Sequence, residues 1–86
     1  MSLNNTLQAL SDPTRRKILE LLKKRDLSVS DIADNFDIKL PSVSHHLSVL
    51  KQSGLVTFQR KGQELIYSLN LSVFEEVIKY IIKITK

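Results

Sequence analysis

The chain has 86 residues, of which 26% are charged, and it carries a formal net charge of +4 and no cysteine. This length fits one domain, residues 1–86, which buries only about 60% of its unfolded surface, and the lack of cysteine excludes disulfides, thiolate metal sites and cysteine nucleophiles. No apolar run reaches the roughly 18 residues of a membrane span and no signal-peptide pattern opens the chain, so we expect a cytoplasmic protein.

Two helices are predicted in the first part of the chain. Leucines at positions 3, 7 and 10 share one helical face, and this pattern stops at Ser11. Asp12 is a favourable N-cap residue and Pro13 suits the first helical position, so a second helix should span residues 13–24. Its core candidates are Ile18, Leu19, Leu21 and Leu22.

Basic residues are concentrated in and just after that second helix. Within residues 14–25, Glu20 is the only acidic residue, against Arg15, Arg16, Lys17, Lys23, Lys24 and Arg25. Such a cluster suits a polyanion, because phosphate contacts release counterions. Solvated side chains without a ligand would give the same pattern, and the composition leaves both readings open.

Residues 27–55 predict two short amphipathic helices joined by a tight turn. Ser28, with Asp31 three positions later, resembles a capping box that starts the first of them. The second should start near Pro41, which disfavours helical geometry at the residue before it, and end before Gly54. Its buried stripe consists of Val43, Leu47 and Leu50.

The opposite side of this second helix is polar and has no acidic residue. In a helix-turn-helix, the N-terminal part of the second helix enters the major groove, where carboxylates would be repelled by phosphate. An ordinary helical hairpin with solvated serines would show the same pattern. As DNA contacts on this face we predict Pro41, Ser42, Ser44, His45 and Ser48.

A β-hairpin should follow the second helix directly. Residues 55–60 and 65–69 are rich in β-branched and aromatic side chains, and Gly62 lies in the turn between them. A hairpin in this position is a wing, with Arg60 and Lys61 expected at its tip, where they would contact phosphate or the minor groove. Charged tips also serve solubility, which is the competing interpretation.

The last predicted helix, residues 72–85, is more apolar than a surface helix requires. Part of its wide apolar face can pack on its own domain, and the rest needs a protein partner to cover it, unless a small domain uses the whole helix to complete its core. With the first helix it predicts a dimer interface formed by Leu3, Leu7, Val73, Val77, Tyr80, Ile81 and Ile84.

Five segments together resemble the ArsR family of bacterial winged-helix repressors, and within it the autorepressors of the sporulation-delay type, which lack a metal site. The resemblance rests on residues 12–19, 27–33, 42–47, 60–63 and 66–69. It implies a mainly helical α+β winged helix-turn-helix domain with four helices, two strands and a fifth helix. It further implies a homodimer, joined by the first and last helices, whose recognition helices read an inverted repeat in major grooves about 34–36 Å apart.

The resemblance also bears on metals and on the two histidines. Relatives that sense metals carry a Cys-x-Cys pair where this chain has Ser28 and Ser30, and others place Asp and His ligands on the last helix, where only Glu75 and Glu76 could serve. We therefore expect no metal site and no cofactor. His45 matches a family position that contacts DNA. His46 lies beside the buried stripe and is expected to pack or form a hydrogen bond, and Lys39 replaces the usual capping serine.

The predicted function is sequence-specific repression, with the chain's own gene as a target and double-stranded DNA and a second copy of the chain as partners. An antirepressor protein, in the membrane or elsewhere, is a candidate third partner. A winged-helix module that binds another protein through its last helix is the main alternative. An enzyme is not expected, because Ser44 and His45 point apart on an exposed face and no neighbouring carboxylate orients the imidazole.

Overall fold

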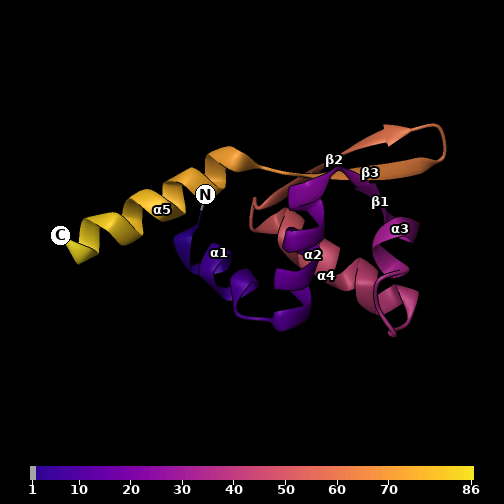
Figure 1. Cartoon of the computed structure of the whole chain (residues 1–86), viewed down its shortest axis with the longest axis horizontal. Coiled ribbons are helices and arrows are strands. Elements are labelled where there is room, and N and C mark those ends of the chain that lie inside the picture. The colour runs from indigo at the N-terminus through magenta and orange to yellow at the C-terminus, as the bar shows by residue number, and fades with distance from the viewer. Residues whose placement is uncertain (1) are drawn as a thin grey trace.

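The computed structural model describes residues 2–86 and has a winged helix-turn-helix fold. The β2–β3 hairpin and the last helix extend from opposite ends of a helical body, which gives extents of 45 × 25 × 21 Å (Figure 1). The mainly helical fold predicted from the sequence is confirmed. In chain order the elements are α1 (Leu3–Leu10), α2 (Pro13–Lys24), β1 (Leu27–Ser28), α3 (Val29–Ala33), α4 (Leu40–Gln52), β2 (Val56–Lys61), β3 (Glu64–Leu69) and α5 (Leu71–Thr85).

Helix starts follow the capping chemistry of the sequence. The Asp12 carboxylate accepts a hydrogen bond from the Arg15 backbone N–H at 3.0 Å, and the Ser28 hydroxyl accepts one from the Asp31 N–H at 3.2 Å. The bond from Arg15 holds the pKa of Asp12 below its usual value. Each such cap stabilises its helix by about 1 kcal/mol, which explains why α2 and α3 begin where the sequence predicts.

The sheet has three strands, in the order β1-β3-β2, rather than the two that the sequence predicts. The additional strand, β1, pairs antiparallel with β3, with Leu27 opposite Tyr67. Two residues are too few to show the alternation of a strand, so this pairing is determined by contact with β3 and not by local sequence. The predicted hairpin is present as β2 and β3, and β1 adds a third strand that was not predicted.

The wing turn consists of Gly62 and Gln63, which follow the last residue of β2. Gly62 has φ 63°, and within residues 2–86 only glycines have positive φ, so Gln63 does not. A positive φ at the first central position alone is typical of a type II′ hairpin turn, which favours glycine there. Lys61 pairs with Glu64 and Arg60 with Leu65. The two basic residues therefore occupy the last two positions of β2, next to the turn at the hairpin tip.

The core is formed by the apolar sides of α2, α3 and α4 against the sheet. Ile18 of α2 and Ile32 of α3 have no exposed surface, and the predicted stripe of α4 is equally buried at Val43, Leu47 and Leu50. Phe58 and Tyr67 lie across from each other on β2 and β3, with ring centroids 5.4 Å apart. This core fixes which side of α4 remains exposed.

Gly54 should be sensitive to substitution because α4 ends there in a left-handed conformation. Its φ is 84°, and an added Cβ would lie 3.4 Å from Cγ2 of Val73 in α5. We expect Gly54→Ala to lower the free energy of unfolding by about 1–2 kcal/mol, the cost of the left-handed backbone for a residue with a Cβ, when measured by urea denaturation at one fixed protein concentration.

Gly62→Ala is the matched control for this substitution. It carries a similar backbone strain at φ 63°, but an added Cβ meets nothing within 4 Å. We expect a loss no larger than that of Gly54→Ala. If Gly54→Ala had the free energy of unfolding of the wild type, the claim that position 54 requires glycine would be wrong.

Candidate nucleic-acid interface

The exposed side of α4 carries all five DNA contacts predicted for it. Pro41, Ser42, Ser44, His45 and Ser48 are exposed, and α4 contains no acidic residue. The core stripe described above holds the opposite side of the helix against the domain. The structure therefore gathers these side chains on one solvent-facing surface that is compatible with a phosphate-lined groove.

The start of α4 lacks a side-chain cap, as the replacement of the usual serine by Lys39 suggested. Lys39 is the N-cap residue and its side chain makes no capping hydrogen bond. Its carbonyl accepts from the N–H groups of Ser42 and Val43, at 3.0 and 3.3 Å. The helix start is thus held by backbone bonds, and no acidic side chain lies in its first turn.

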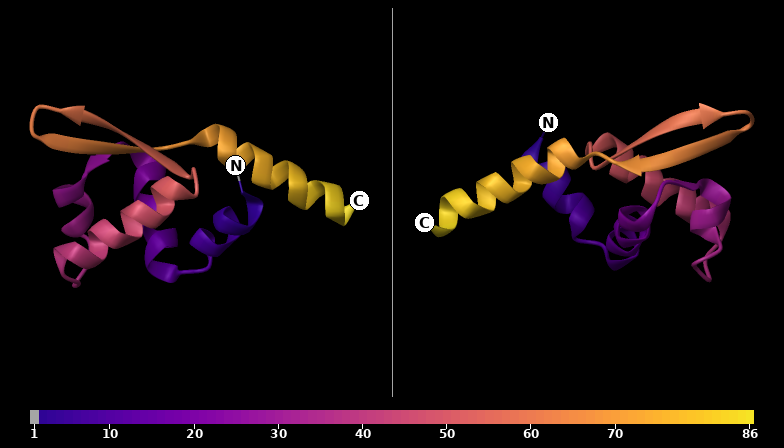
Figure 2. Two further views of the ribbon diagram at one scale, coloured as in Figure 1. Left: turned by 180° about the vertical axis from the view of Figure 1, so that it is seen from behind. Right: turned by 45° about the horizontal axis from the view of Figure 1, so that its top comes forward.

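The wing contributes Arg60 and Lys61, both exposed on β2. A cation–π contact links this strand to the recognition helix, because Lys51 Nζ of α4 lies 4.3 Å from the centre of the Phe58 ring. Such contacts stabilise by about 0.5–1 kcal/mol at exposed sites. The wing therefore has a fixed attachment near the end of α4, while its basic residues project with the hairpin beyond the helical body (Figure 2).

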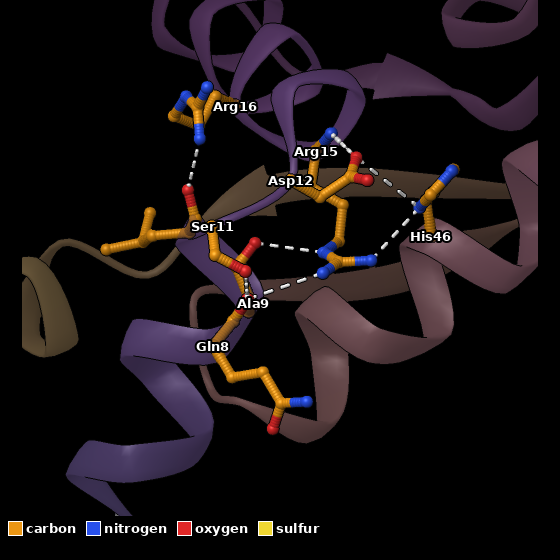
Figure 3. Close-up of polar contacts among 8 residues, drawn as sticks. Gln8, Ala9, Ser11, Asp12, Arg15, Arg16 and His46 are labelled. Atoms are coloured by element: carbon orange, nitrogen blue, oxygen red, sulfur yellow. Dashed lines mark hydrogen bonds and ion pairs between the residues drawn. The ribbon is translucent and has the colours of Figure 1, made fainter.

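Arg15 and Arg16, two residues of the basic cluster, contact the end of α1 (Figure 3). Arg15 donates from Nε to Ala9 O at 2.9 Å, and Arg16 donates from Nη1 to Leu10 O at 2.8 Å. Cations near a helix C-terminus satisfy its last carbonyls and interact favourably with its dipole. Arg15, which is half-buried, therefore has an internal role. The other five basic residues of the cluster are exposed: Arg16, Lys17, Lys23, Lys24 and Arg25.

The two histidines have different surroundings. His45 is exposed, whereas the side chain of His46 is 18% exposed and its Nδ1 lies 3.2 Å from Arg15 Nη1 and 3.9 Å from Asp12 Oδ2. Because a guanidinium only donates, Nδ1 is the acceptor and the neutral ring carries its proton on Nε2. The predicted hydrogen-bonding role of His46 is confirmed. Its partner, Arg15, lies 31 positions away in the chain and was not predicted.

The residues predicted for the dimer interface divide into two groups. Leu7, Tyr80, Ile81 and Ile84 are 40–63% exposed, and Leu3 is half-buried. Val73 and Val77 are only 8% and 6% exposed, because the first half of α5 packs on its own domain while the second half extends past it (Figure 2). Val73 and Val77 therefore offer little surface to a partner chain. Three exposed apolar residues of α5 were not assigned to it: Leu71, Ile78 and Ile82.

The four positions considered for metal binding lie in different surroundings. Ser28 is buried and caps α3, and Ser30, Glu75 and Glu76 are exposed. Across residues 2–86, no three His, Asp or Glu side chains are grouped so that they could hold a metal ion. In the same part of the chain, every helix is too short or too polar to cross a membrane.

Comparison with known proteins gives consistent matches. The model of the bacterial regulatory protein arsR family matches residues 12–57. The transcriptional repressor SdpR of Bacillus subtilis strain 168 is 50% identical over 80 residues, which cover 93% of this chain and 89% of the repressor.

Solved structures agree with the sequence matches. A crystal structure of an ArsR family transcriptional regulator superposes with a TM-score of 0.92 at 32% identity, covering 96% of this chain and 91% of that one. The solution structure of a homodimeric winged helix-turn-helix DNA-binding domain from Mycobacterium bovis has a TM-score of 0.79 at 26% identity, covering 94% and 78% of the two chains.

Proposed function

The chain belongs to the arsR family of bacterial regulatory proteins, and we propose that it is a homodimeric transcriptional repressor that reads an inverted-repeat operator, including one at its own gene. This family consists of regulators and not of enzymes. The observation that supports the proposal most strongly is the acid-free exposed side of α4, held opposite a fully buried stripe and followed directly by a basic wing.

Dimerisation is supported by the exposed apolar residues of α5 and by a homodimeric relative. Tyr80, Ile81 and Ile84 lie on the half of α5 that extends past its own domain, and α1 adds Leu7. Burying apolar surface stabilises by about 25 cal/mol per Å², so these residues favour a second copy of the chain over water. The Mycobacterium bovis domain, whose fold this chain shares, is a homodimer.

We propose that repression does not depend on a metal. The chain has no cysteine and only two histidines, and these are neighbours in α4. Adjacent helical residues point about 100° apart, so the two imidazoles do not form a chelate on one face. In place of a metal signal, we propose that a protein partner, in the membrane or elsewhere, releases the repressor from DNA.

Binding to DNA upstream of the chain's own gene tests this function. We expect an affinity at least about 1,000-fold higher than for random DNA of the same length, measured by fluorescence anisotropy at physiological salt. A ratio near one, together with a monomer in light scattering, would instead favour a module that binds another protein.

Lys61→Ala should weaken the binding of operator and random DNA by similar factors. Lys61 is exposed at the end of β2, and its proposed contact is with phosphate, which carries no sequence information. The slope of log affinity against log salt should fall by about one, because one counterion fewer is released. Lys79→Ala, which removes an exposed lysine of α5, is the matched control and should leave the slope unchanged. An unchanged slope in Lys61→Ala would remove the wing from the phosphate contacts.

A further inference from the structure

Polar contacts join α1 to α4 at two points. One runs directly from Thr6 of α1 to the end of α4, where α5 also meets α4, and the other runs through Arg15 of α2. We propose that Thr6 and Arg15 are positioning residues, which hold the recognition helix at a fixed place relative to the dimerisation helices and thereby set the half-site spacing that the repressor accepts. The inference rests on the proposed function, because it assumes a dimer formed through α1 and α5.

The first contact lies at the C-terminal end of α4. Thr6 of α1 has no exposed surface, and its hydroxyl is 3.1 Å from Ser53 O and 3.0 Å from Ser2 O. One hydroxyl hydrogen is therefore shared between its own helix and the end of α4. This buried bond fixes the distance and the orientation of α1 relative to the end of α4, because breaking it would leave the buried carbonyl of Ser53 without this donor.

The start of α5 meets α4 at the same place. The Asn70 N–H, just before α5, donates to Leu55 O at 2.9 Å. Val73 of α5 lies next to Gly54, where an added Cβ would be 3.4 Å from its Cγ2, an ordinary contact distance. Residues 53–55, which we name the α4 junction, thus contact both proposed dimerisation helices. A shift of either helix would be transmitted directly to the end of the recognition helix.

The second contact lies near the middle of α4 (Figure 3). The Arg15 guanidinium binds Ala9 O and Gln8 O in the last turn of α1 and, through Nη1, His46 Nδ1 at 3.2 Å. A planar guanidinium has a rigid set of donors, so it fixes these groups relative to one another in a way that lysine would not. Two points of attachment prevent α4 from pivoting about the junction.

Between the two contacts, the boundary of α1 and α4 opens to solvent on one side, while Ala9 of α1 is fully buried in the core. A groove of about 340 Å³ lies there, lined by residues that include Asn5, Gln8, Val49 and Gln52. Thr6 and Arg15 supply the polar part of the connection between the two helices, beside the apolar packing of Ala9 in the core. Their loss should loosen the position of α4 without disturbing the buried stripe that holds its other side.

The spacing of half-sites provides a measurement specific to this role. A dimer on two half-sites requires its recognition helices at one separation, and inserting or deleting one base pair shifts the sites by about 3.4 Å and rotates them. A rigid protomer then forces the DNA to deform, which we expect to lower wild-type affinity about tenfold or more. A loosened protomer would adjust instead.

The test compares Thr6→Val/Arg15→Gln with wild type on operators of natural, shortened and lengthened spacing. The double variant should lose affinity for the natural operator and show a spacing penalty of about threefold or less, while keeping wild-type affinity for one isolated half-site. Thr57→Val/Lys17→Gln likewise removes one hydroxyl and one positive charge, at positions outside both contacts, and should keep the full penalty. A full penalty in the double variant would overturn the inference, whereas no spacing preference in wild type would overturn the proposed function itself.

His46→Leu keeps the test decisive if the double variant does not fold. It removes the contacts of His46 with Arg15 and Asp12 and keeps the buried Thr6 bond. We expect its spacing penalty to lie between those of wild type and the double variant. A wild-type penalty in His46→Leu would overturn the role of Arg15 as a positioning residue.

Discussion

Ile81→Glu is expected to convert the protein from a dimer to a monomer at micromolar concentration and to abolish operator binding. Ile81 is 47% exposed on the half of α5 that extends past its own domain, so its own domain leaves it uncovered. Moving a carboxylate into an apolar interface without a partner costs several kcal/mol, and each ~1.4 kcal/mol weakens association tenfold. Light scattering across a concentration series measures the dimer, and anisotropy measures the loss of operator affinity.

Ser72→Glu is the control for this substitution. It adds the same charge to the same helix, but Ser72 lies about 180° from Ile81 around the helix axis, on the polar side. A carboxylate in the first turn also suits the helix dipole, so we expect a wild-type dimer. If Ile81→Glu remained dimeric as well, the proposed use of α5 in the interface would be wrong.

His45→Asp is expected to lower operator affinity at least about 100-fold without unfolding the protein. His45 is exposed in the middle of a side of α4 that has no acidic residue, and like charges placed against each other at an interface cost several kcal/mol. His45→Ala, which removes the imidazole without adding a carboxylate, should cost about 1–3 kcal/mol and act on specific binding more than on random DNA.

The neighbouring histidine gives the matched comparison. His46→Asp places the same carboxylate one position along the chain, on the side that faces Arg15 and Asp12 rather than solvent. We expect its main effect on stability, measured by urea denaturation, and a smaller effect on DNA binding by the molecules that remain folded. Wild-type operator affinity in His45→Asp would exclude this side of α4 from the DNA interface.

Local chemistry made much of the fold predictable from the sequence. Asp12 and Ser28 start helices because their side chains accept from nearby backbone N–H groups, and both bonds are present in the structure. Gly54 and Gly62 mark a helix end and a turn because both adopt positive φ. The buried stripe of α4 follows from helical spacing alone, so the exposed polar side opposite it could also be predicted.

Contacts between distant segments were not predictable in the same way. The strand β1 exists because Leu27 meets Tyr67, and the hydrogen bond from Arg15 to His46 joins residues that lie 31 positions apart. The basic composition around Arg15 left a polyanion contact and a solvated side chain both open, and the internal bonds of Arg15 follow only from the folded arrangement. Val73 and Val77 are indistinguishable by type from the exposed apolar residues of α5, and only the path of the chain buries them.

Footprinting on the DNA upstream of the chain's own gene tests the central claim most directly. A homodimer with one recognition helix per subunit should protect two half-sites of an inverted repeat, with centres about 34–36 Å, one turn of DNA, apart. Protection should disappear for Ile81→Glu and His45→Asp but persist for Ser72→Glu. Uniform protection, or a single protected half-site bound as tightly as the pair, would contradict a dimer that reads DNA through α4.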